Sequence, residues 1–296
     1  MKVDSPRDRW FPLGLGLVLL AAGATVGGVA AGAEAAILGG LAGLTGGLWL
    51  AGRMERRSAR QRIVLARPFP EAWRDFLLER YEHFERLPDG LRQSFETDLK
   101  VFLAEKRITG VGTEATEELR LLVGASAVTL TLGWPRAEWD VLTEVLLYPD
   151  DFDRDYAFGG LDLAGQTHPW GTVILSAPAL LESFEYPDDG FHVGLHEFAH
   201  LLDVERSEFD GMPTGLSEAR RRDWAALVDR EMERLRDGRS VLDPYGADDP
   251  VEFFAVAVET FFERPRELRR RHAELYALLA EYFVQDPAAW DDARKR

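Results

Sequence analysis

The chain has 296 residues, 46% hydrophobic and 29% charged, so it is long and apolar enough to bury a substantial core. Its formal net charge of −16 argues against nucleic acid as the main partner, because phosphate binding needs clustered Lys and Arg. The absence of cysteine excludes disulfides and every zinc site built on thiolates. Any zinc must therefore be held by histidines and carboxylates.

Residues 13–51 are almost entirely apolar or glycine. Two uncharged runs, at about 13–31 and 35–51, are separated by Glu34; the first is long enough to span a bilayer, and the second is at the short end of the range. The many glycines would let two such helices approach closely. We therefore predict a membrane hairpin of two transmembrane helices over residues 1–58, ahead of a second domain over residues 59–296.

Basic residues flank this segment on both sides (Lys2, Arg7 and Arg9 before it; Arg53, Arg56, Arg57, Arg60 and Arg62 after it). Both ends should then remain in the cytoplasm, which predicts a protein of the cell inner membrane with a cytoplasmic catalytic domain. Two other interpretations stay open: a cleaved signal peptide ending near residues 31–33, or one long tilted anchor that leaves the domain outside. Glu34 favours the hairpin, because a charge is costly at membrane depth and tolerated at a turn.

The rest of the chain is predicted to be mostly helical. A basic linker over residues 58–70 contains Pro68 and Pro70, which break any preceding helix. Two helices are expected within 71–106, and others at 113–131, 218–236, 251–263 and 268–283. Two strands are expected at 143–149 and 171–176, separated by an acidic loop; the second is either an edge strand that pairs with a peptide or part of the core sheet. These elements predict an α+β fold with a small sheet.

The central motif is His196-Glu197-Phe198-Ala199-His200. On a helix, His196 and His200 lie one turn apart and project from the same face, so two imidazoles can hold one Zn²⁺. Glu197 can reach a metal-bound water and act as general base. Asp203 lies three residues beyond His200 on nearly the same face, which makes it a candidate for supporting a ligand.

Two histidines rarely hold catalytic zinc alone, and three protein ligands are usual. In one class of site the third ligand falls six residues after the second histidine, and Arg206, a cation, excludes that class here. Another class takes a glutamate from a later helix, and Glu252 and Glu259 share one face of the apolar helix 251–263. Because a buried carboxylate is costly unless it is paired or bound to a metal, at least one of them should meet the zinc or its histidines.

Several motifs together resemble the Mlc titration factor A family of zinc peptidases: residues 145–149, Gly190-Phe191, 196–203, 245–256 and 259–262. The resemblance covers roughly residues 67–287. It implies a gluzincin-like catalytic domain with aminopeptidase activity, and some members of the family bind and sequester a sugar-responsive transcriptional repressor.

The resemblance also implies roles for particular residues. His196, His200 and Glu252 would ligate zinc, Glu197 would be the general base, and Tyr245 would stabilise the oxyanion or donate a proton. A packed loop aromatic is the alternative role for Tyr245. For Glu259, a hydrogen bond to a ligating histidine and an ordinary ion pair remain open.

The sequence thus predicts a membrane-anchored zinc metallopeptidase that acts on a peptide or protein substrate. The alternative is a regulatory binding protein that sequesters a transcription factor with little or no hydrolysis. A third interpretation is a membrane scaffold with a closed, structural zinc site. The intact set His196, Glu197, His200 and Glu252 favours the enzyme, since a pure binding protein does not need the general base.

Overall fold

The structure of the chain is a computed structural model. It describes residues 18, 21, 22, 25, 26, 33–134, 139–158, 163–205 and 208–294. Contacts within the chain divide it into two units, residues 1–68 and 69–296. Each unit is described by itself.

The main element of the first unit is a single helix, α2 (Ala33–Ala66), with Glu34 in its first turn. The helix continues through residue 58, where the sequence predicted a linker, and ends just before Arg67 and Pro68. The proline accounts for this end, because the residue before a proline is disfavoured in the helical conformation. The predicted break therefore occurs, but eight residues after the predicted start of the linker.

The prediction of two transmembrane helices is wrong. Within the described part of the chain, no helix is both long and apolar enough to cross a membrane. The first predicted span, 13–31, lies mostly outside the described residues, and the second, 35–51, is part of α2. The glycines of α2 add no apolar side-chain surface, and the helix runs on into a charged stretch. The predicted inner-membrane location with a cytoplasmic domain rested on these helices, and it is wrong as well.

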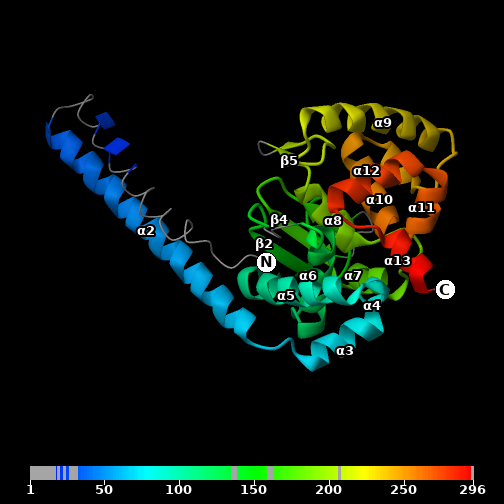
Figure 1. Ribbon diagram of the computed structural model, residues 1–296, viewed down its shortest axis with the longest axis horizontal. Coiled ribbons are helices and arrows are strands. Elements are labelled where there is room, and N and C mark those ends of the chain that lie inside the picture. Colours follow the sequence, from blue (N-terminus) through cyan, green and yellow to red (C-terminus); the bar gives the residue numbers. More distant parts are fainter. Residues whose placement is uncertain are drawn as a thin grey trace. The chain divides into compact units, whose positions relative to one another are not determined.

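The second unit is mostly helical and contains a small sheet (Figure 1). Its N-terminal helices are α3 (Glu71–Arg80), α4 (Glu82–Arg86), α5 (Asp89–Glu105) and α6 (Glu117–Thr131). Two short helices follow the sheet, α7 (Ala177–Glu185) and α8 (Val193–Leu201). The C-terminal elements are α9 (Glu218–Arg236), η1 (Pro244–Ala247), α10 (Pro250–Glu263), α11 (Pro265–Arg271), α12 (Ala273–Phe283) and α13 (Pro287–Arg294).

Four strands form the main sheet in the order β1-β2-β4-β3. Strands β1 (Arg107–Gly110), β2 (Glu144–Tyr148) and β4 (Thr172–Ser176) are parallel, and β3 (Gly165–Thr167) runs antiparallel to β4. A separate two-stranded ribbon joins β5 (Val204–Glu205) to β6 (Glu208–Phe209).

The two faces of the main sheet contact different cores. On the inner face, Val173 and Leu175 of β4 belong to the main hydrophobic core, together with the helices. On the outer face, Ile174 packs with Phe152 in a small separate cluster. This alternation follows from the pleat of a strand, which sends successive side chains to opposite faces.

Two details of the fold differ from the expectation for residues 71–176, and a third decides between two alternatives that the sequence left open. Residues 71–106 form three helices, because Tyr81 adopts an extended conformation (φ −128°, ψ 94°) between α3 and α4. Strand β3 lies inside the predicted acidic loop. Consequently β4, which the sequence identified at 171–176, is not the edge of the sheet, and β3 is.

Helix α8 lies in the middle of the second unit. It contacts α6, α7 and α10 on the helical side and β3 and β4 on the other, and Figure 1 shows it between the strands and the C-terminal helices. All nine residues of α8 are buried. Gly194 allows the close approach of α6, since a Cβ there would lie 2.3 Å from the hydroxyl of Ser126. The motif helix is therefore held from several sides.

Candidate metal centre

The start of α8 is fixed by His192. Its Nδ1 accepts a hydrogen bond from the backbone N–H of Leu195, so the side chain caps one of the free N–H groups of the first turn. His196 and His200 follow one turn apart, with ring centroids 4.8 Å from each other. The helical spacing thus brings both imidazoles to one side of α8, as the sequence predicted.

Glu252 reaches this pair from the first turn of α10. Asp249 caps that helix by accepting hydrogen bonds from the N–H groups of Val251 and Glu252, at 2.8 and 3.0 Å. The Oε2 atom of Glu252 lies 3.0 Å from Nε2 of His196 and 3.8 Å from Nε2 of His200. One ligand atom from each of His196, His200 and Glu252 lies within 4.8 Å of the others, so in the described part of the chain this group could hold a metal ion.

Glu259, two turns further along α10, contacts the other side of His196. Its Oε1 is 2.7 Å from Nδ1 of His196, and its Oε2 accepts the backbone N–H of His192. When Nδ1 carries the imidazole proton and donates it to Glu259, Nε2 is left with a free lone pair that faces Glu252. Two roles were left open for Glu259, and the geometry favours the hydrogen bond to a candidate ligand, His196.

The two histidines differ in their electrostatic surroundings. Burial disfavours the charge of His196, but the carboxylates of Glu259 and Glu252 outweigh that effect and raise its pKa well above the usual value. Burial lowers the pKa of His200 to about 3, so this imidazole is neutral. The Nδ1 atom of His200 is buried and has no hydrogen-bond partner among the described residues.

Glu197 projects toward the sheet, where β3 meets α8. The hydroxyl of Thr167 lies 2.7 Å from its carboxylate and 2.8 Å from its backbone carbonyl. Burial raises the pKa of Glu197 to about 7, although the charge of His196 and the hydrogen bond from Thr167 act in the opposite direction. Gly165 leaves room for the carboxylate, since a Cβ there would lie 2.6 Å from Glu197. Sequence reasoning missed Thr167 and Gly165, which fall in the predicted loop.

Tyr245 lies in η1, seven residues before Glu252. Asp243 caps this short helix, and the tyrosine ring is 6.1 Å from the ring of His196. Burial, together with the charge of Glu252 and a hydrogen bond to it, raises the pKa of Tyr245, so its hydroxyl stays protonated. The side chain is about half exposed, and its hydroxyl faces Glu252.

Asp203 contacts a loop instead of a histidine. Its carboxylate accepts hydrogen bonds from the backbone N–H groups of Asp210, Gly211 and Met212, at 2.9–3.1 Å. Helix α8 ends at Leu201, so Asp203 lies beyond the helical face that suggested a role beside His200. The structure therefore brings together His196, Glu197, His200, Tyr245, Glu252 and Glu259, but not Asp203.

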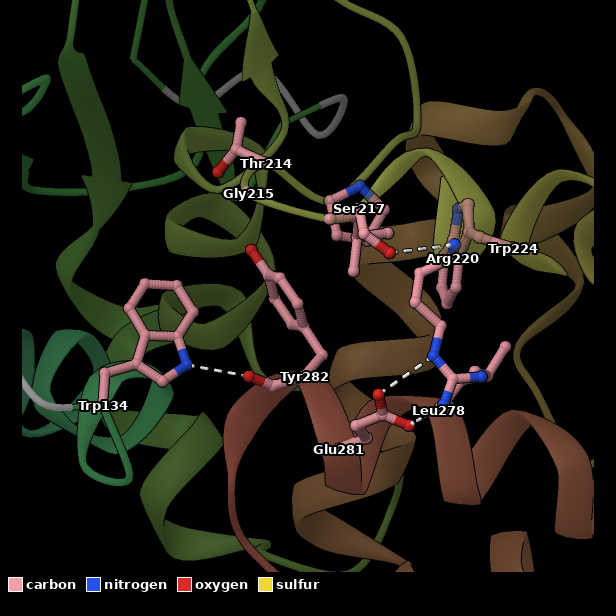
Figure 2. Close-up of a pocket in the computed structure, with 11 residues that line it drawn as sticks. Trp134, Thr214, Gly215, Ser217, Arg220, Trp224, Leu278, Glu281 and Tyr282 are labelled. Atoms are coloured by element: carbon pink, nitrogen blue, oxygen red, sulfur yellow. Dashed lines mark hydrogen bonds and ion pairs between the residues drawn. The ribbon is translucent and has the colours of Figure 1, made fainter. Parts of the chain in front are cut away.

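A cavity of about 460 Å³ lies elsewhere, between the start of α9, the end of α12 and the loop at 213–217. Figure 2 shows Arg220 paired with Glu281 at this cavity, and the indole N–H of Trp134 donating to the carbonyl of Tyr282. None of the three candidate metal ligands lines it. It is therefore distinct from the candidate metal centre.

The chain is similar in sequence to several known proteins. The chain is 32% identical over 247 residues to an uncharacterised protein of Synechocystis sp., covering 77% of this chain and 89% of that protein. It is 30% identical over 225 residues to Mlc titration factor A of Pectobacterium atrosepticum, covering 69% and 82%. It is also 30% identical over 241 residues to Mlc titration factor A of Edwardsiella ictaluri, covering 74% and 88%.

A family-level match covers most of the second unit and part of α2. The sequence profile of the family described as glucose-regulated metallo-peptidase M90 matches residues 55–284. This range contains His196, His200 and Glu252, the three side chains that could hold a metal ion. The chain belongs to the glucose-regulated metallo-peptidase M90 family.

Proposed function

We propose that this protein is a zinc-dependent peptidase in which Glu197 acts as the general base. The observation that carries the proposal is the convergence of His196, His200 and Glu252 on one point, with Glu197 adjacent on the same helix. Catalytic zinc sites are commonly built from two histidines and one carboxylate, with a further position left for water or substrate.

The three side chains fit a zinc ion chemically. His200 is neutral because burial lowers its pKa to about 3, and a neutral imidazole is the form that binds metal. His196, whose pKa is raised by Glu259 and Glu252, would release its Nε2 proton when a metal binds, and the contact from Glu259 to Nδ1 orients its ring with Nε2 toward Glu252. A zinc ion held there supplies a Lewis acid that polarises a peptide carbonyl and lowers the pKa of water.

Glu197 is suited to proton transfer between water and the leaving amine. Burial raises its pKa to about 7, near the pH at which a general base is most effective. Thr167 holds the carboxylate in one orientation through the 2.7 Å hydrogen bond. In the proposed reaction, Glu197 takes a proton from the attacking water and passes it to the amine nitrogen as the peptide bond breaks.

Tyr245 is proposed to donate a hydrogen bond to the oxyanion that forms on the substrate carbonyl. Its pKa is raised by burial and by Glu252, so the phenol remains a donor at neutral pH. The ring stands 6.1 Å from that of His196, and the hydroxyl hydrogen-bonds to Glu252, which supports a place for it beside the candidate metal centre.

The direct test is metal analysis of the full-length protein together with cleavage of a peptide library. Wild-type protein should contain about one zinc per chain and cleave peptides. Glu197→Gln should retain zinc and lose hydrolysis, whereas His200→Ala should lose both. Full hydrolysis by Glu197→Gln would contradict the proposal. N-acetylated peptides extend the test, because loss of cleavage on acetylation would identify the aminopeptidase activity that the family resemblance implies.

A second candidate function is capture of a transcriptional regulator without hydrolysis. It is motivated by the name titration factor that the curated relatives carry. The buried Glu197, which a binding protein does not need, favours the peptidase. A regulator that is bound by wild-type protein and remains intact, and is bound equally by Glu197→Gln, would favour the second candidate.

A further inference from the structure

The edge of the sheet next to Glu197 is available for pairing. Among the described strands, β3 pairs only with β4, and just before β3 the backbone of Leu163 exchanges two hydrogen bonds with that of Phe152. The N–H of Ser176 bonds to the carbonyl of Ala164, and the N–H of His168 bonds to the carbonyl of Thr172. In an antiparallel ladder these bonds alternate, so the backbone groups of Gly165 and Thr167 point away from β4. No backbone hydrogen bond among the described residues occupies these groups, so they can bind the backbone of an added strand.

An extended peptide added to this edge sends its side chains alternately to the two faces of the sheet. The peptide residues opposite Gly165 and Thr167 project to the inner face, where Thr167 contacts Glu197. The peptide residue opposite His168 projects to the outer face, because His168 lies opposite Thr172, two residues before the outward-facing Ile174. One substrate side chain must then lie against the surface around His168.

That surface is aromatic, and we call its three residues, Tyr156, His168 and Trp170, the aromatic platform. The rings of His168 and Trp170 are stacked, with centroids 4.3 Å apart and planes 6° from parallel. The hydroxyl of Tyr156 lies 3.3 Å from Nε2 of His168. Trp170 is 66% exposed and Tyr156 is 42% exposed, so much of this aromatic surface is uncovered. Exposed, clustered aromatic surface of this kind is typical of binding sites.

The backbone holds the platform in a fixed geometry. Tyr156 has a positive φ of 64°, a conformation that is unfavourable for a bulky residue. Asp153 maintains this turn by accepting hydrogen bonds from the N–H groups of Asp155 and Ala157. On the other side, Gly171 has φ of 92° and sits so close to Val141 that a Cβ would lie 1.7 Å from its carbonyl oxygen. Backbone conformations that are energetically unfavourable are frequent at ligand-binding sites. The strained backbone at Tyr156 therefore favours a binding role for these aromatic rings.

The charge of the surroundings restricts the ligand. The loop that carries Tyr156 contains four aspartates and one arginine over residues 150–155. A negatively charged peptide side chain would be repelled there, whereas an uncharged or basic peptide would not. The offset or edge-on packing of a further ring against Trp170 adds to the gain from burying apolar area.

We propose that the aromatic platform is a specificity subsite of the peptidase, which takes an aromatic side chain of an extended, uncharged or basic peptide paired with β3. The inference rests on the proposed peptidase function for the scissile bond, but the binding it describes does not depend on hydrolysis. Trp170 and His168 provide the aromatic contact, and Tyr156 positions His168 through its hydroxyl.

The test uses the full-length, zinc-loaded protein and peptides of alanine and lysine in which one phenylalanine is moved through successive positions. At one position, phenylalanine should raise kcat/KM by about tenfold over alanine, the size of effect expected for one apolar contact in a pocket. Glutamate at that position should lower it. Trp170→Ala should abolish the gain, so that its kcat/KM no longer differs between the peptides with and without phenylalanine, and Trp170→Phe should restore part of the gain.

The matched control is Tyr186→Ala, which removes an exposed aromatic ring outside the platform and should preserve the preference for phenylalanine. Retention of the full preference by Trp170→Ala would overturn the proposal.

A binding measurement separates failure of this inference from failure of the peptidase function. The Glu197→Gln protein is titrated with the phenylalanine and alanine peptides, with and without Trp170→Ala. Tighter binding of the phenylalanine peptide that depends on Trp170 supports the subsite even if no peptide is cleaved by the wild type. Cleavage that depends on Glu197, with binding indifferent to Trp170, overturns the subsite and leaves the peptidase in place. No binding by any of these proteins overturns the subsite as well.

Discussion

Thr167 is the only contact from the sheet to the carboxylate of Glu197 among the hydrogen bonds of the described residues. A hydrogen bond to an ionised group is stronger than one between neutral groups. Its loss should therefore lower the rate of catalysis. We expect Thr167→Val to lower kcat by about tenfold to a hundredfold, because a carboxylate that is not oriented transfers protons less efficiently. Peptide hydrolysis by proteins of verified zinc content measures this.

Thr172→Val, a substitution of the same kind in β4, is the control and should leave kcat unchanged. Equal kcat values for Thr167→Val and the wild type would show that Thr167 does not orient Glu197.

Glu259 is predicted to control metal affinity through His196. Its Oε1 holds Nδ1 at 2.7 Å, and loss of such a support for a ligating histidine typically weakens metal binding by about tenfold to a hundredfold. We expect Glu259→Gln to show a decrease of this size in zinc affinity, measured by competition with a chromophoric chelator. Glu263→Gln, one turn further along the same helix, should bind zinc like the wild type. A Glu259→Gln protein with wild-type affinity would contradict this role.

At the scale of elements, Asp203 connects the loop after β6 to the end of α8 through hydrogen bonds. Three backbone N–H groups converge on one buried carboxylate, and Trp224 donates to the carbonyl of Gly211 in the same loop. Asp203→Ala would leave the N–H groups of Asp210 and Gly211 without this acceptor, at about 1–3 kcal/mol for each one that stays buried, whereas Met212 keeps its hydrogen bond to the side chain of Asp210. We expect the free energy of unfolding in urea to fall by roughly 3 kcal/mol.

Asp223→Ala removes an exposed carboxylate on α9 and should change the free energy of unfolding by less than about 1 kcal/mol. A similarly small change for Asp203→Ala would mean that the loop is not held by this carboxylate.

The spacing of residues within α8 and α10 is what made much of the site predictable. Helical geometry alone relates His196 to His200. Glu252 and Glu259 were noticeable as carboxylates on an apolar helix, because a buried carboxylate without a partner is energetically costly. The assignment of Glu252 as a ligand and the interest in Tyr245 depended on the family resemblance. Asp203 shows the limit of the argument, because the helix ends before it.

Other features depend on contacts that no local pattern reveals. Thr167 reaches Glu197 from thirty residues away, through a three-residue strand that is too short to produce a recognisable alternation. The membrane hairpin was predicted from composition, and glycine-rich apolar sequence proved a poor guide to a membrane span here. The α+β character, by contrast, was predictable from long periodic segments, because in such segments many residues indicate the same helix or strand.

At the scale of the whole molecule, Glu263 should make stability depend on pH. Burial, followed by repulsion from Asp189 and Glu259, raises the pKa of Glu263 to about 9. Because this folded-state pKa lies above the ordinary value of 4.5, folding favours the protonated form. The contribution to stability is complete below pH 4.5 and is lost as the pH rises toward 9.

We therefore expect Glu263→Gln to gain stability relative to the wild type between pH 5 and 9, by up to about 1.4 kcal/mol per pH unit. Chemical unfolding at several pH values measures the difference. Glu274→Gln, which removes an exposed carboxylate, corrects for the change in net charge. A difference between Glu263→Gln and the wild type that stays constant with pH would show that Glu263 is not protonated in the folded protein.

A metal ion at the candidate centre would join α8 to α10, two elements separated by about fifty residues of chain. A ligand that binds only the folded state raises stability in proportion to the logarithm of its concentration over Kd. We expect removal of zinc by a chelator to lower Tm, and the decrease to persist in Glu197→Gln, which retains all three ligands. In His200→Ala the chelator should have no effect on Tm. An equal decrease in His200→Ala would place the metal elsewhere.

The shortness of β3 has a consequence for self-association. An exposed sheet edge can template pairing with another copy of the same protein, and proteins often limit this by keeping such strands short. With three residues, β3 exposes the outward backbone groups of only Gly165 and Thr167. Such a ladder is too small to hold two folded molecules together. In the proposed peptidase, a peptide whose carbonyl also contacts the metal centre would have a second point of attachment, so the same edge would discriminate between a substrate and a neighbouring molecule.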